Sequence, residues 1–461
     1  MQVISLKKLL LGVADENRIE NMPDTPIDGV VTDSRQGIKG KVFVAIKGEK
    51  VDGHDFAKTA IEQGVELVIA QHNIDGVDSQ KILVVENVLD ALIQMGKNYR
   101  NGFSPRLVGV TGSVGKTTTK EFCAAVFSDF GETLKTAGNQ NNEIGMPNTL
   151  FKLDDKTQYA IIEMGMQGLG EIEKLTLAAQ PEAAIITSVG HSHLAQLKTR
   201  ENICKAKMEI CQGLPKDGIL VINGDDDYLP KATLPKGIRR FTFAINAKNA
   251  DVVAFDIKSK NKGQTFKIKD CKNGEFEVFI PAHGVHNVYN ALGAYTLATR
   301  MGLNPHKVSV ALADYKTTGF RQNEVSCGGF TVIEDCYNAN PDSMAAALKM
   351  LAEKKCEGKK IAVLGDMLEL GEISVKAHYN AGKQAAECGA NVVIAIGEKS
   401  TEIAKGAKEN GVEKVLHFNN NEQAATAVLT LCQKGDIILF KASRGMKLEE
   451  IMQKLYKEKQ G

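Results

Sequence analysis

Residues 111–122 read TGSVGKTTTKEF and follow directly on the apolar run LVGV at 107–110. Glycines at such a junction free backbone N–H groups to close around an anion, and a helix beginning at Lys116 adds its positive N-terminal end. In this pattern the Lys116 ammonium can reach nucleotide phosphates, and the Thr117 hydroxyl can hold Mg²⁺. The pattern G-x-x-x-x-G-K-[ST] would place its first glycine at Val110, so the match is incomplete. The alternative is a flexible turn followed by a helix cap, but strand, loop and Lys-Thr in register favour nucleotide binding.

The composition narrows the class of protein. A chain of 461 residues, 43% hydrophobic and 25% charged, predicts a soluble globular protein of about three domains. The net charge of +1 predicts no binding to nucleic acid or to anionic membranes. Nine scattered cysteines without a CxxC pair indicate reduced thiols and a cytoplasmic protein. The first apolar run stops at Ala14, which favours an amphipathic helix over a secretory signal, and we expect no membrane insertion.

The chain divides into three predicted α/β domains, 1–105, 106–314 and 315–461. In the first, KVFVAI (41–46) and ELVIA (66–70) are predicted strands, and FAKTAIEQG (56–64) is the helix between them. This domain is expected to be small and to bind substrate.

The second domain is predicted to hold a mainly parallel sheet. After LVGV come the buried-strand runs YAIIEMG (159–165), AAIITSV (183–189) and GILVING (218–224), separated by helical stretches. TFKIKD (265–270) and EFEVFI (275–280) then alternate around Asn273-Gly274, which predicts an antiparallel hairpin attached as a flap. A helix over 287–302 closes the domain.

The third domain is predicted to be Rossmann-like. Its four predicted strands alternate with helices: KIAVLG (360–365), NVVIAIG (391–397), KVLHF (414–418) and DIILFKAS (436–443). Because no G-x-G-x-x-G follows these strands, we predict no bound dinucleotide there.

Several polar residues stand at the ends of predicted strands. Glu163 ends YAIIE, where a parallel sheet presents metal ligands; the alternative is an acid in solvent. His191 and His193, if extended, would point to the same side and bind metal or phosphate, although loop hydrogen bonds are the alternative. Lys205 and Lys207 lie on a predicted helix, where lysines are usually solvated.

Asparagine clusters form a further group. GNQNNEIGMP (138–147), HNVYN (286–290) and EDCYNANPDS (334–343) offer paired donors and acceptors, which suit a nucleobase, ribose or peptide backbone. Taken singly, such residues are more often loop and cap residues. Arg321 in GFRQNE is a candidate phosphate contact.

In this order the motifs resemble the Mur ligase family, the ATP-dependent amide ligases of peptidoglycan synthesis, over almost the whole chain. Within the family, four stretches (33–56, YNANPDSM, AVLGDMLELGE at 362–372, and KASRGMKLEE) resemble the member that joins D-alanyl-D-alanine (D-Ala-D-Ala) to UDP-N-acetylmuramoyl-tripeptide (UDP-MurNAc-tripeptide). The chain lacks the Asp-Asn-Pro-Arg motif of the sister enzyme that adds a single amino acid to the dipeptide precursor. That sister remains the closest alternative.

The resemblance implies a role for each matching residue. The ATP phosphates would meet Gly112, Ser113, Val114, Gly115, Lys116, Thr117, Thr118 and Asn142. One Mg²⁺ would bind Thr117 and Glu163, and a second would bind His193 and a carbamylated Lys207, so that Lys116, His193 and Lys207 are the catalytic residues. Asn287 and Asn290 would face adenine, and Arg321 and Asp335 would reach ATP from the C-terminal domain. Substrate would meet Ser34, Arg35, Asp52, Gly53 and His54 in a UDP pocket, and Tyr337, Asn338, Asn340 and Ser343 in the third domain.

The implied reaction forms an acyl phosphate on the tripeptide, which the dipeptide amine then attacks. Water must be excluded, so a closing C-terminal domain with a hinge near 313–318 is expected, in a monomer. A GTPase switch is disfavoured because Asn261-Lys262 is followed by Gly-Gln rather than by the guanine motif. A binding protein without catalysis is disfavoured by the intact set of Lys116, Thr117, Glu163, His193 and Lys207.

Overall fold

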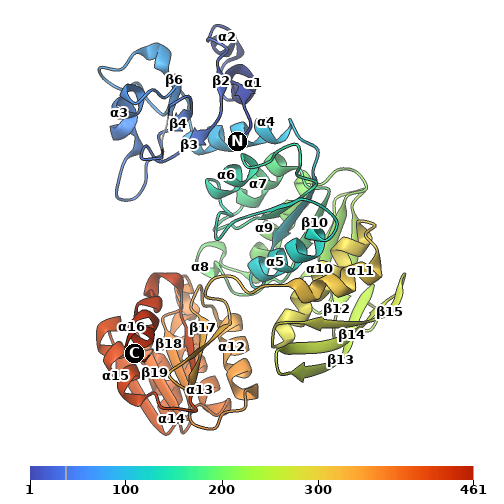
Figure 1. Cartoon of the computed structure of the whole chain (residues 1–461), viewed down its shortest axis with the longest axis vertical. Coiled ribbons are helices and arrows are strands. Elements are labelled where there is room, and N and C mark those ends of the chain that lie inside the picture. The colour runs from blue at the N-terminus through green and yellow to red at the C-terminus, as the bar shows by residue number, and fades with distance from the viewer. Residues whose placement is uncertain (37–38, 460–461) are drawn as a thin grey trace.

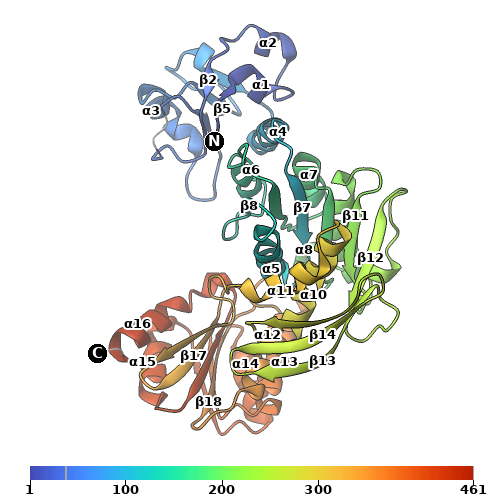
Figure 2. The ribbon, with the colours of Figure 1, turned by 45° about the vertical axis from the view of Figure 1, so that its right-hand side comes forward.

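The computed structural model describes residues 1–36 and 39–459. Residues 37 and 38, inside the 33–56 stretch, and residues 460 and 461 at the end of the chain lie outside the described residues. Three α/β domains follow one another along the long axis, with the central domain between the other two (Figures 1 and 2). Within the described part of the chain the strands form sheets of two, four, nine and six strands.

The N-terminal domain carries the two smaller sheets. Its strands are β1 (Ile4–Ser5), β2 (Pro26–Ile27), β3 (Val30–Val31), β4 (Val42–Val44), β5 (Leu67–Ala70) and β6 (Ile82–Val84). Its helices are α1 (Leu6–Leu10), α2 (Glu16–Glu20), α3 (Ala57–Glu62) and α4 (Val88–Arg100). Strands β3 to β6 are parallel and in sequence order, while β1 and β2 pair antiparallel. The predicted strands at 41–46 and 66–70 and the helix between them are confirmed as β4, β5 and α3, and α1 confirms the first helix.

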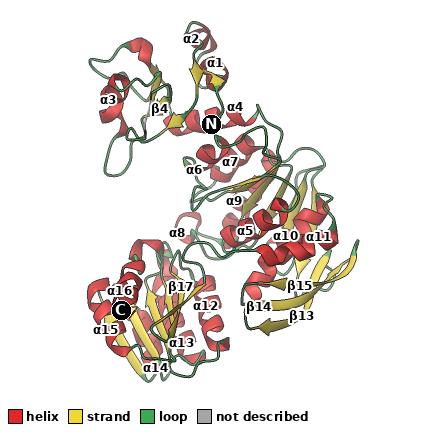
Figure 3. Ribbon diagram, in the orientation of Figure 1, coloured by secondary structure: helices red, strands yellow, loops and turns green. Residues whose placement is uncertain are grey.

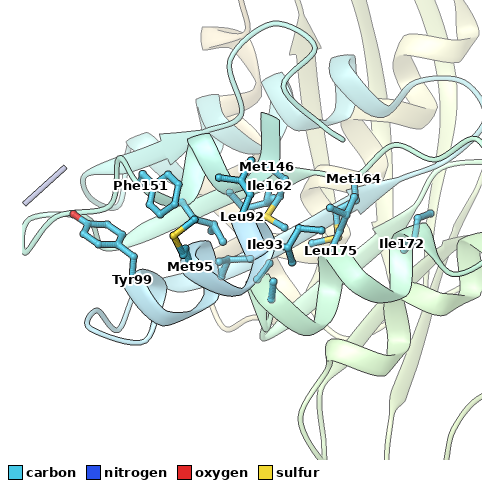
Figure 4. Packing of buried hydrophobic residues seen from close by; sticks show 14 of the residues in the cluster. Leu92, Ile93, Met95, Tyr99, Met146, Phe151, Ile162, Met164, Ile172 and Leu175 are labelled. Carbon is cyan, nitrogen blue, oxygen red and sulfur yellow. The ribbon is translucent and has the colours of Figure 1, made fainter. Parts of the chain in front are cut away.

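Helix α4 joins the N-terminal domain to the central one. Its apolar side chains, among them Leu92, Ile93 and Met95, are buried in one cluster with residues of the central domain such as Met146 and Ile162 (Figure 4). The Tyr99 hydroxyl also donates a hydrogen bond of 2.8 Å to the Leu153 carbonyl. The N-terminal domain is therefore anchored through a shared apolar core rather than through a flexible tether.

The central domain is built on the nine-stranded sheet, in the order β15-β14-β13-β12-β11-β10-β7-β9-β8. Its strands are β7 (Arg106–Thr111), β8 (Thr133–Lys135), β9 (Tyr159–Glu163), β10 (Ala183–Ile186), β11 (Ile219–Asn223), β12 (Arg239–Ala244), β13 (Val252–Lys260), β14 (Gly263–Asp270) and β15 (Gly274–Ile280). Its helices are α5 (Lys116–Ser128), α6 (Gly145–Leu150), α7 (Glu171–Ala179), α8 (Leu194–Leu197), α9 (Arg200–Met208), α10 (Val285–Arg300) and α11 (Pro305–Ala311).

Strand β7 shows why this sheet has two covered faces. Leu107 belongs to the core cluster shared with α4, α7 and α9, whereas Val108 and Val110 belong to the cluster under α5 and α10. Successive strand residues point to opposite faces, so an uninterrupted apolar run needs helices on both. Strands β13, β14 and β15 pair antiparallel, which confirms the predicted flap, and α10 confirms the helix predicted over 287–302.

The C-terminal domain holds a six-stranded sheet in the order β16-β17-β21-β18-β19-β20, parallel except for β16. Figure 3 shows the strands of this domain in yellow among its helices in red. Its strands are β16 (Asn323–Cys327), β17 (Phe330–Asp335), β18 (Lys360–Gly365), β19 (Val392–Ile396), β20 (Lys414–Phe418) and β21 (Ile437–Lys441). Its helices are α12 (Pro341–Glu353), α13 (Ser374–Glu387), α14 (Thr401–Glu409), α15 (Asn421–Leu431) and α16 (Glu449–Lys459). The four predicted strands are confirmed; the hairpin of β16 and β17, which turns at Gly328-Gly329, was not predicted. Among the described helices none has the length and apolar character that a membrane span requires.

Candidate active site

A cavity of about 1060 Å³ lies between the central and C-terminal domains. It brings together stretches that are far apart in the sequence: the phosphate loop, the asparagine segment before α6, the end of β9, the start of α10 and the first part of the C-terminal domain. The predicted site residues that line it are Ser113, Val114, Gly115, Lys116, Thr117, Thr118, Asn142, Glu163, His193, Asn287, Asn290, Arg321, Asp335, Tyr337, Asn338, Asn340 and Ser343. The remaining predicted residues lie beneath this lining or in the N-terminal domain.

The phosphate loop needs glycine at two positions for steric reasons. Gly112 has φ +151° and Gly115 has φ +86°. A Cβ at Gly112 would lie 1.8 Å from Thr187 Oγ1, and one at Gly115 would lie 2.4 Å from Asn290 Oδ1. Gly115 also precedes α5 without a side-chain cap, so the first N–H groups of this helix are left for an anion.

The Lys116 side chain lies over the phosphate loop, where it could bind an anion. Its Nζ donates a hydrogen bond of 2.7 Å to the Gly112 carbonyl, which folds the side chain back over the loop. Burial lowers the pKa of Lys116; the Glu163 carboxylate opposes that shift, while Arg321 adds to it. A bound polyphosphate would offset the effects of burial and of Arg321 on the charged form of Lys116, because it supplies negative charge next to the ammonium.

Glu163 ends β9 in register with Val110 of β7 and is 1% exposed. Its Oε1 accepts hydrogen bonds from Thr117 Oγ1 at 3.1 Å and from Asn141 Nδ2 at 2.8 Å. Its Oε2 is buried, has no hydrogen-bond partner among the described residues, and lies 3.8 Å from Lys120 Nζ. The alternative of a solvent-exposed acid is therefore wrong. A carboxylate oxygen left unpartnered beside a threonine hydroxyl is the donor chemistry that Mg²⁺ prefers.

Asn141 is a site residue that the sequence did not single out. The predicted residue was its neighbour Asn142, whose Oδ1 instead accepts from the backbone N–H groups of Ile144 and Gly145 at the start of α6, although Asn142 also lines the cavity. A faint sequence signal for Asn141 is Gly165, just past β9. A Cβ there would lie 3.1 Å from Asn141 Cγ, so glycine leaves room for the amide.

The segment that carries His191 and His193 is not extended, so the condition for their pointing to the same side as in a strand is not met. His193 has φ +64°, because the chain reverses there into α8. His191 Nδ1 lies 3.2 Å from Asp342 Oδ2, and His193 Nδ1 lies 3.2 Å from Glu369 Oε2, both carboxylates of the C-terminal domain. Among the described residues, the His193 Nδ1 atom has this carboxylate close by but no aligned hydrogen-bond partner.

Lys207 lies beneath the cavity, on α9, and only 1% of it is exposed. The expectation of a solvated lysine holds for Lys205, which is exposed, but is wrong for Lys207. Lys207 lies one helical turn after the buried Ile203 and therefore shares its face. Burial, and secondarily the charge of Lys116, hold the pKa of Lys207 well below its ordinary value. This shift favours the neutral, nucleophilic form of the amine.

The predicted adenine-facing residues form a polar cluster on α10. Asn287 Nδ2 donates to the His283 carbonyl at 2.7 Å and to Gln322 Oε1 at 3.0 Å. Asn290 Oδ1 accepts from Thr119 Oγ1 at 3.2 Å. Gln322 belongs to the chain entering the C-terminal domain, so these amides already link the two domains.

The C-terminal domain contributes cations to the same cavity. The Arg321 guanidinium lies 3.8 Å from the centroid of the Tyr337 ring. Asp335, at the end of β17, pairs with Lys441 at 3.0 Å, and burial raises the pKa of Asp335 despite this partner. Lys441 was not predicted as a site residue, although it ends the buried strand β21 as Glu163 ends β9.

The predicted UDP-pocket residues lie in the N-terminal domain, outside the cavity lining. Asp52 caps a short 3-10 helix (Gly53–Phe56) through the His54 backbone N–H. His54 is buried, and its Nε2 accepts from the Gln71 N–H at 3.0 Å. Arg35 is exposed and pairs with Asp33.

Comparisons with known proteins agree with this arrangement. Family models match residues 26–100 (Mur ligase family, catalytic domain), 110–298 (Mur ligase middle domain) and 321–444 (Mur ligase, glutamate ligase domain). The chain is 38% identical over 434 residues to UDP-N-acetylmuramoyl-tripeptide–D-alanyl-D-alanine ligase of Bacillus subtilis, with 94% of this chain and 93% of the relative covered. It is 34% identical over 436 residues to the enzyme of the same description from Escherichia coli, with 94% of each covered.

Solved structures give the same result. MurF from Acinetobacter baumannii matches with a TM-score of 0.89 at 29% identity, covering 99% of both chains. The MurF ligase from Thermotoga maritima, solved in complex with ADP, matches with a TM-score of 0.82 at 30% identity, covering 93% of this chain and 97% of that one. With a phosphate loop, a buried strand-end carboxylate and a facing C-terminal domain in one cavity, and with relatives matched from end to end, the chain belongs to the Mur ligase family.

Proposed function

We propose that the protein joins D-Ala-D-Ala to the tripeptide carboxylate of UDP-MurNAc-tripeptide at the expense of ATP, which gives the UDP-MurNAc-pentapeptide used in peptidoglycan synthesis. The observation that carries this is the single cavity that joins the phosphate loop to the YNANPDS segment of the C-terminal domain. Relatives bearing the name of this reaction match the chain at up to 38% identity over 94% of its length. The reaction consumes ATP, so we place it in the cytoplasm, and we propose a monomer.

Each domain has its own task in this proposal. Residues 1–105 bind the UDP end of the substrate through Ser34, Arg35, Asp52, Gly53 and His54. Residues 106–314 bind ATP, with the phosphates at Gly112 to Thr118 and near Asn142, and with adenine at Asn287 and Asn290. Residues 315–461 bring Arg321 and Asp335 to ATP. The segment with Tyr337, Asn338, Asn340 and Ser343 meets the dipeptide.

The first chemical step moves the γ-phosphoryl group of ATP to the tripeptide carboxylate, releasing ADP. Two anions must approach each other, so positive charge has to lie between them. Lys116 supplies one charge when its Nζ leaves the Gly112 carbonyl for the phosphates. The N-terminal end of α5 supplies partial positive charge from the uncapped N–H groups after Gly115.

Two groups of residues fit Mg²⁺. Thr117 Oγ1 and Glu163, with its unpartnered Oε2, form the first. His193 and Lys207 would form the second with Lys207 carbamylated. Burial lowers the pKa of this amine, which favours its addition to CO₂ with loss of a proton and gives a carbamate with two oxygen donors. These residues would hold Mg²⁺, which would supply charge neutralisation at the phosphates. Glu163 and Lys207 are each about 1% exposed, so both side chains are shielded from bulk solvent.

The second step is attack of the neutral dipeptide amine on the acyl phosphate, which expels phosphate and leaves the amide. Water competes with the amine, so the cavity must close over the intermediate. Tyr315 is stacked on Phe122 of α5 at 4.0 Å between ring centroids, which fixes the start of the linker to the central domain. We place the hinge at 313–318, the segment that contains Tyr315 and leads into the C-terminal domain. Small-angle scattering should show compaction when an ATP analogue and the UDP-substrate are both bound.

Phosphate release is the direct test. Purified protein is incubated with ATP, Mg²⁺ and UDP-MurNAc-tripeptide, and D-Ala-D-Ala is compared with single amino acids. We expect phosphate release only with D-Ala-D-Ala. The product should be heavier than the tripeptide substrate by the mass of D-Ala-D-Ala less one water. Turnover with a single amino acid on a UDP-MurNAc-dipeptide would instead identify the sister ligase.

The role of the loop is tested by Lys116→Ala, with Lys205→Ala as the matched control, since Lys205 is an exposed lysine on α9. The first variant should lose turnover while keeping its thermal unfolding midpoint, and the second should keep both. Retained turnover in Lys116→Ala would show that the loop does not bind the reacting phosphates.

A further inference from the structure

The AVLGDMLELGE stretch (362–372) is not used in the proposed reaction, although it lies at the boundary with the central domain. Its Asp366 has a role inside the C-terminal domain, where it accepts from the Ser400 backbone N–H at 2.7 Å and from Ser400 Oγ at 2.5 Å. The rest of the stretch turns toward the central domain. Gly371 packs there so closely that a Cβ on it would lie 3.3 Å from the Ala195 Cα.

Glu369 is the part of this stretch that reaches the cavity wall. Its Oε2 lies 3.2 Å from His193 Nδ1. Glu369 has φ +62° and His193 has φ +64°, so two non-glycine residues in the left-handed region meet across the domain boundary. Such conformations are sparsely populated and persist where surrounding contacts hold them, which is common at functional sites.

The two nitrogens of His193 have different surroundings. Nδ1 is buried and, among the described residues, has no aligned hydrogen-bond partner, with the Glu369 carboxylate beside it. The ring as a whole is 21% exposed and lines the cavity. Nε2 is therefore the nitrogen left for a ligand. A histidine that binds a metal commonly donates its other ring N–H to a carboxylate, which fixes the tautomer and the orientation of the ring.

We propose that Glu369 is a positioning residue for His193: its carboxylate keeps the proton on Nδ1 and so presents Nε2 to the cavity. The carboxylate comes from the C-terminal domain, so His193 is oriented only while the two domains are docked here. Neighbouring contacts hold the same loop, since Asn340 Nδ2 donates to Ser192 Oγ at 2.6 Å and His191 meets Asp342. Of these three contacts between the domains, the one made by Glu369 is the contact with His193. The importance of this for turnover rests on the proposed function; the pairing itself does not.

The tautomer of His193 is the primary measurement. Protein labelled with ¹⁵N only in its nine histidines is studied by NMR, with His193→Asn used to assign the resonance. We expect the Nδ1–H form in the wild type and a shift toward the Nε2–H form in Glu369→Ala, which keeps a Cβ and so the same backbone strain. Glu372→Ala is the matched control, because Glu372 is an exposed acid of the same loop without a contact to His193. An unchanged tautomer in Glu369→Ala overturns the proposal.

Metal binding and kinetics test the consequence. Mn²⁺ titrated into the complex with ADP, followed by electron paramagnetic resonance, should bind Glu369→Ala about 10- to 100-fold more weakly at one of its sites, and kcat should fall by a similar factor. The KM for ATP should not change, because Glu369 does not line the nucleotide cavity. Glu369→Asp should recover part of the loss, since it keeps the charge. A loss of the same size in Glu372→Ala would overturn the proposal, because it would show a general loosening of the loop.

These measurements distinguish a failure of the Glu369–His193 pairing from a failure of the proposed function. A tautomer that follows Glu369 in a protein that releases no phosphate with D-Ala-D-Ala supports the pairing and refutes the proposed function. Dipeptide-dependent turnover with a tautomer indifferent to Glu369 supports the function and overturns the pairing.

Discussion

Replacing Asn141 by alanine should weaken the Mg²⁺-dependent part of nucleotide binding. Asn141 Nδ2 and Thr117 Oγ1 share Glu163 Oε1, while Lys120 Nζ lies 3.8 Å from Oε2 on the other side. Without the amide, the carboxylate is free to turn toward Lys120, which is only 1% exposed. Returning the Glu163 carboxylate to Thr117 for Mg²⁺ binding then costs free energy, at most the amount that the Asn141 hydrogen bond contributed.

The size of this effect follows from the kind of bond. A hydrogen bond to a charged group contributes about 1.5–3 kcal/mol, and the 2.8 Å contact to a carboxylate on a residue that is 1% exposed belongs in that range. Since about 1.4 kcal/mol corresponds to a factor of ten, the affinity for Mg²⁺-ADP should fall by about 10- to 150-fold. Binding of ADP in the presence of a chelator should not change.

The assay is calorimetric titration with ADP, with and without Mg²⁺, and Asn139→Ala is the matched control. Asn139 lines the same cavity from the same segment, but its side chain makes no hydrogen bond to Glu163. We expect the ratio of the two affinities to drop only in Asn141→Ala. An unchanged ratio in that variant would refute the reasoning, because it would show that the amide does not hold the carboxylate.

Three further outcomes are expected. Lys207→Met should be more stable than the wild type near neutral pH, because burial disfavours the protonated form of Lys207 in the folded protein but not in the unfolded chain. The gain should shrink as pH rises toward about 10, the ordinary pKa of lysine, in denaturant titrations at several pH values. Arg300→Ala should destabilise by about 3–5 kcal/mol, because it leaves Asp270, the buried last residue of flap strand β14, without its 2.9 Å partner; an unchanged unfolding free energy would contradict this. Leu92→Ala should cost about 2–5 kcal/mol by opening a cavity between α4 and the central domain, measured by chemical denaturation, and a loss below about 1 kcal/mol would show that the shared core is not rigid.

Much of the architecture could be predicted because apolar periodicity is a local property. Uninterrupted runs such as AAIITSV become β10, covered by helices on both faces, and the alternating pair around Asn273-Gly274 becomes the hairpin of β14 and β15. Strand ends also predicted where Glu163 would lie, since the carboxyl ends of parallel strands share one edge of the sheet. The hairpin of β16 and β17 was missed because its alternation is short and half polar.

Side-chain partners could not be predicted in the same way. Asn141 and Asn142 are adjacent and chemically identical, yet one hydrogen-bonds to Glu163 and the other caps α6. Lys205 and Lys207 lie on one helix, yet only Lys207 is buried. Each of these differences depends on which face of an element meets the rest of the protein.

The sequence by itself therefore determined the three α/β domains, the phosphate loop and the family. The loop can be recognised from sequence because its glycines, lysine and threonine are neighbours in the chain and follow an apolar strand run. Only the tertiary structure decided that Glu163 is held by Asn141, that Lys207 is a buried amine, and that Glu369 lies beside His193. The physical reason is that burial and pairing arise between segments far apart in the chain, and no local pattern records which of them meet.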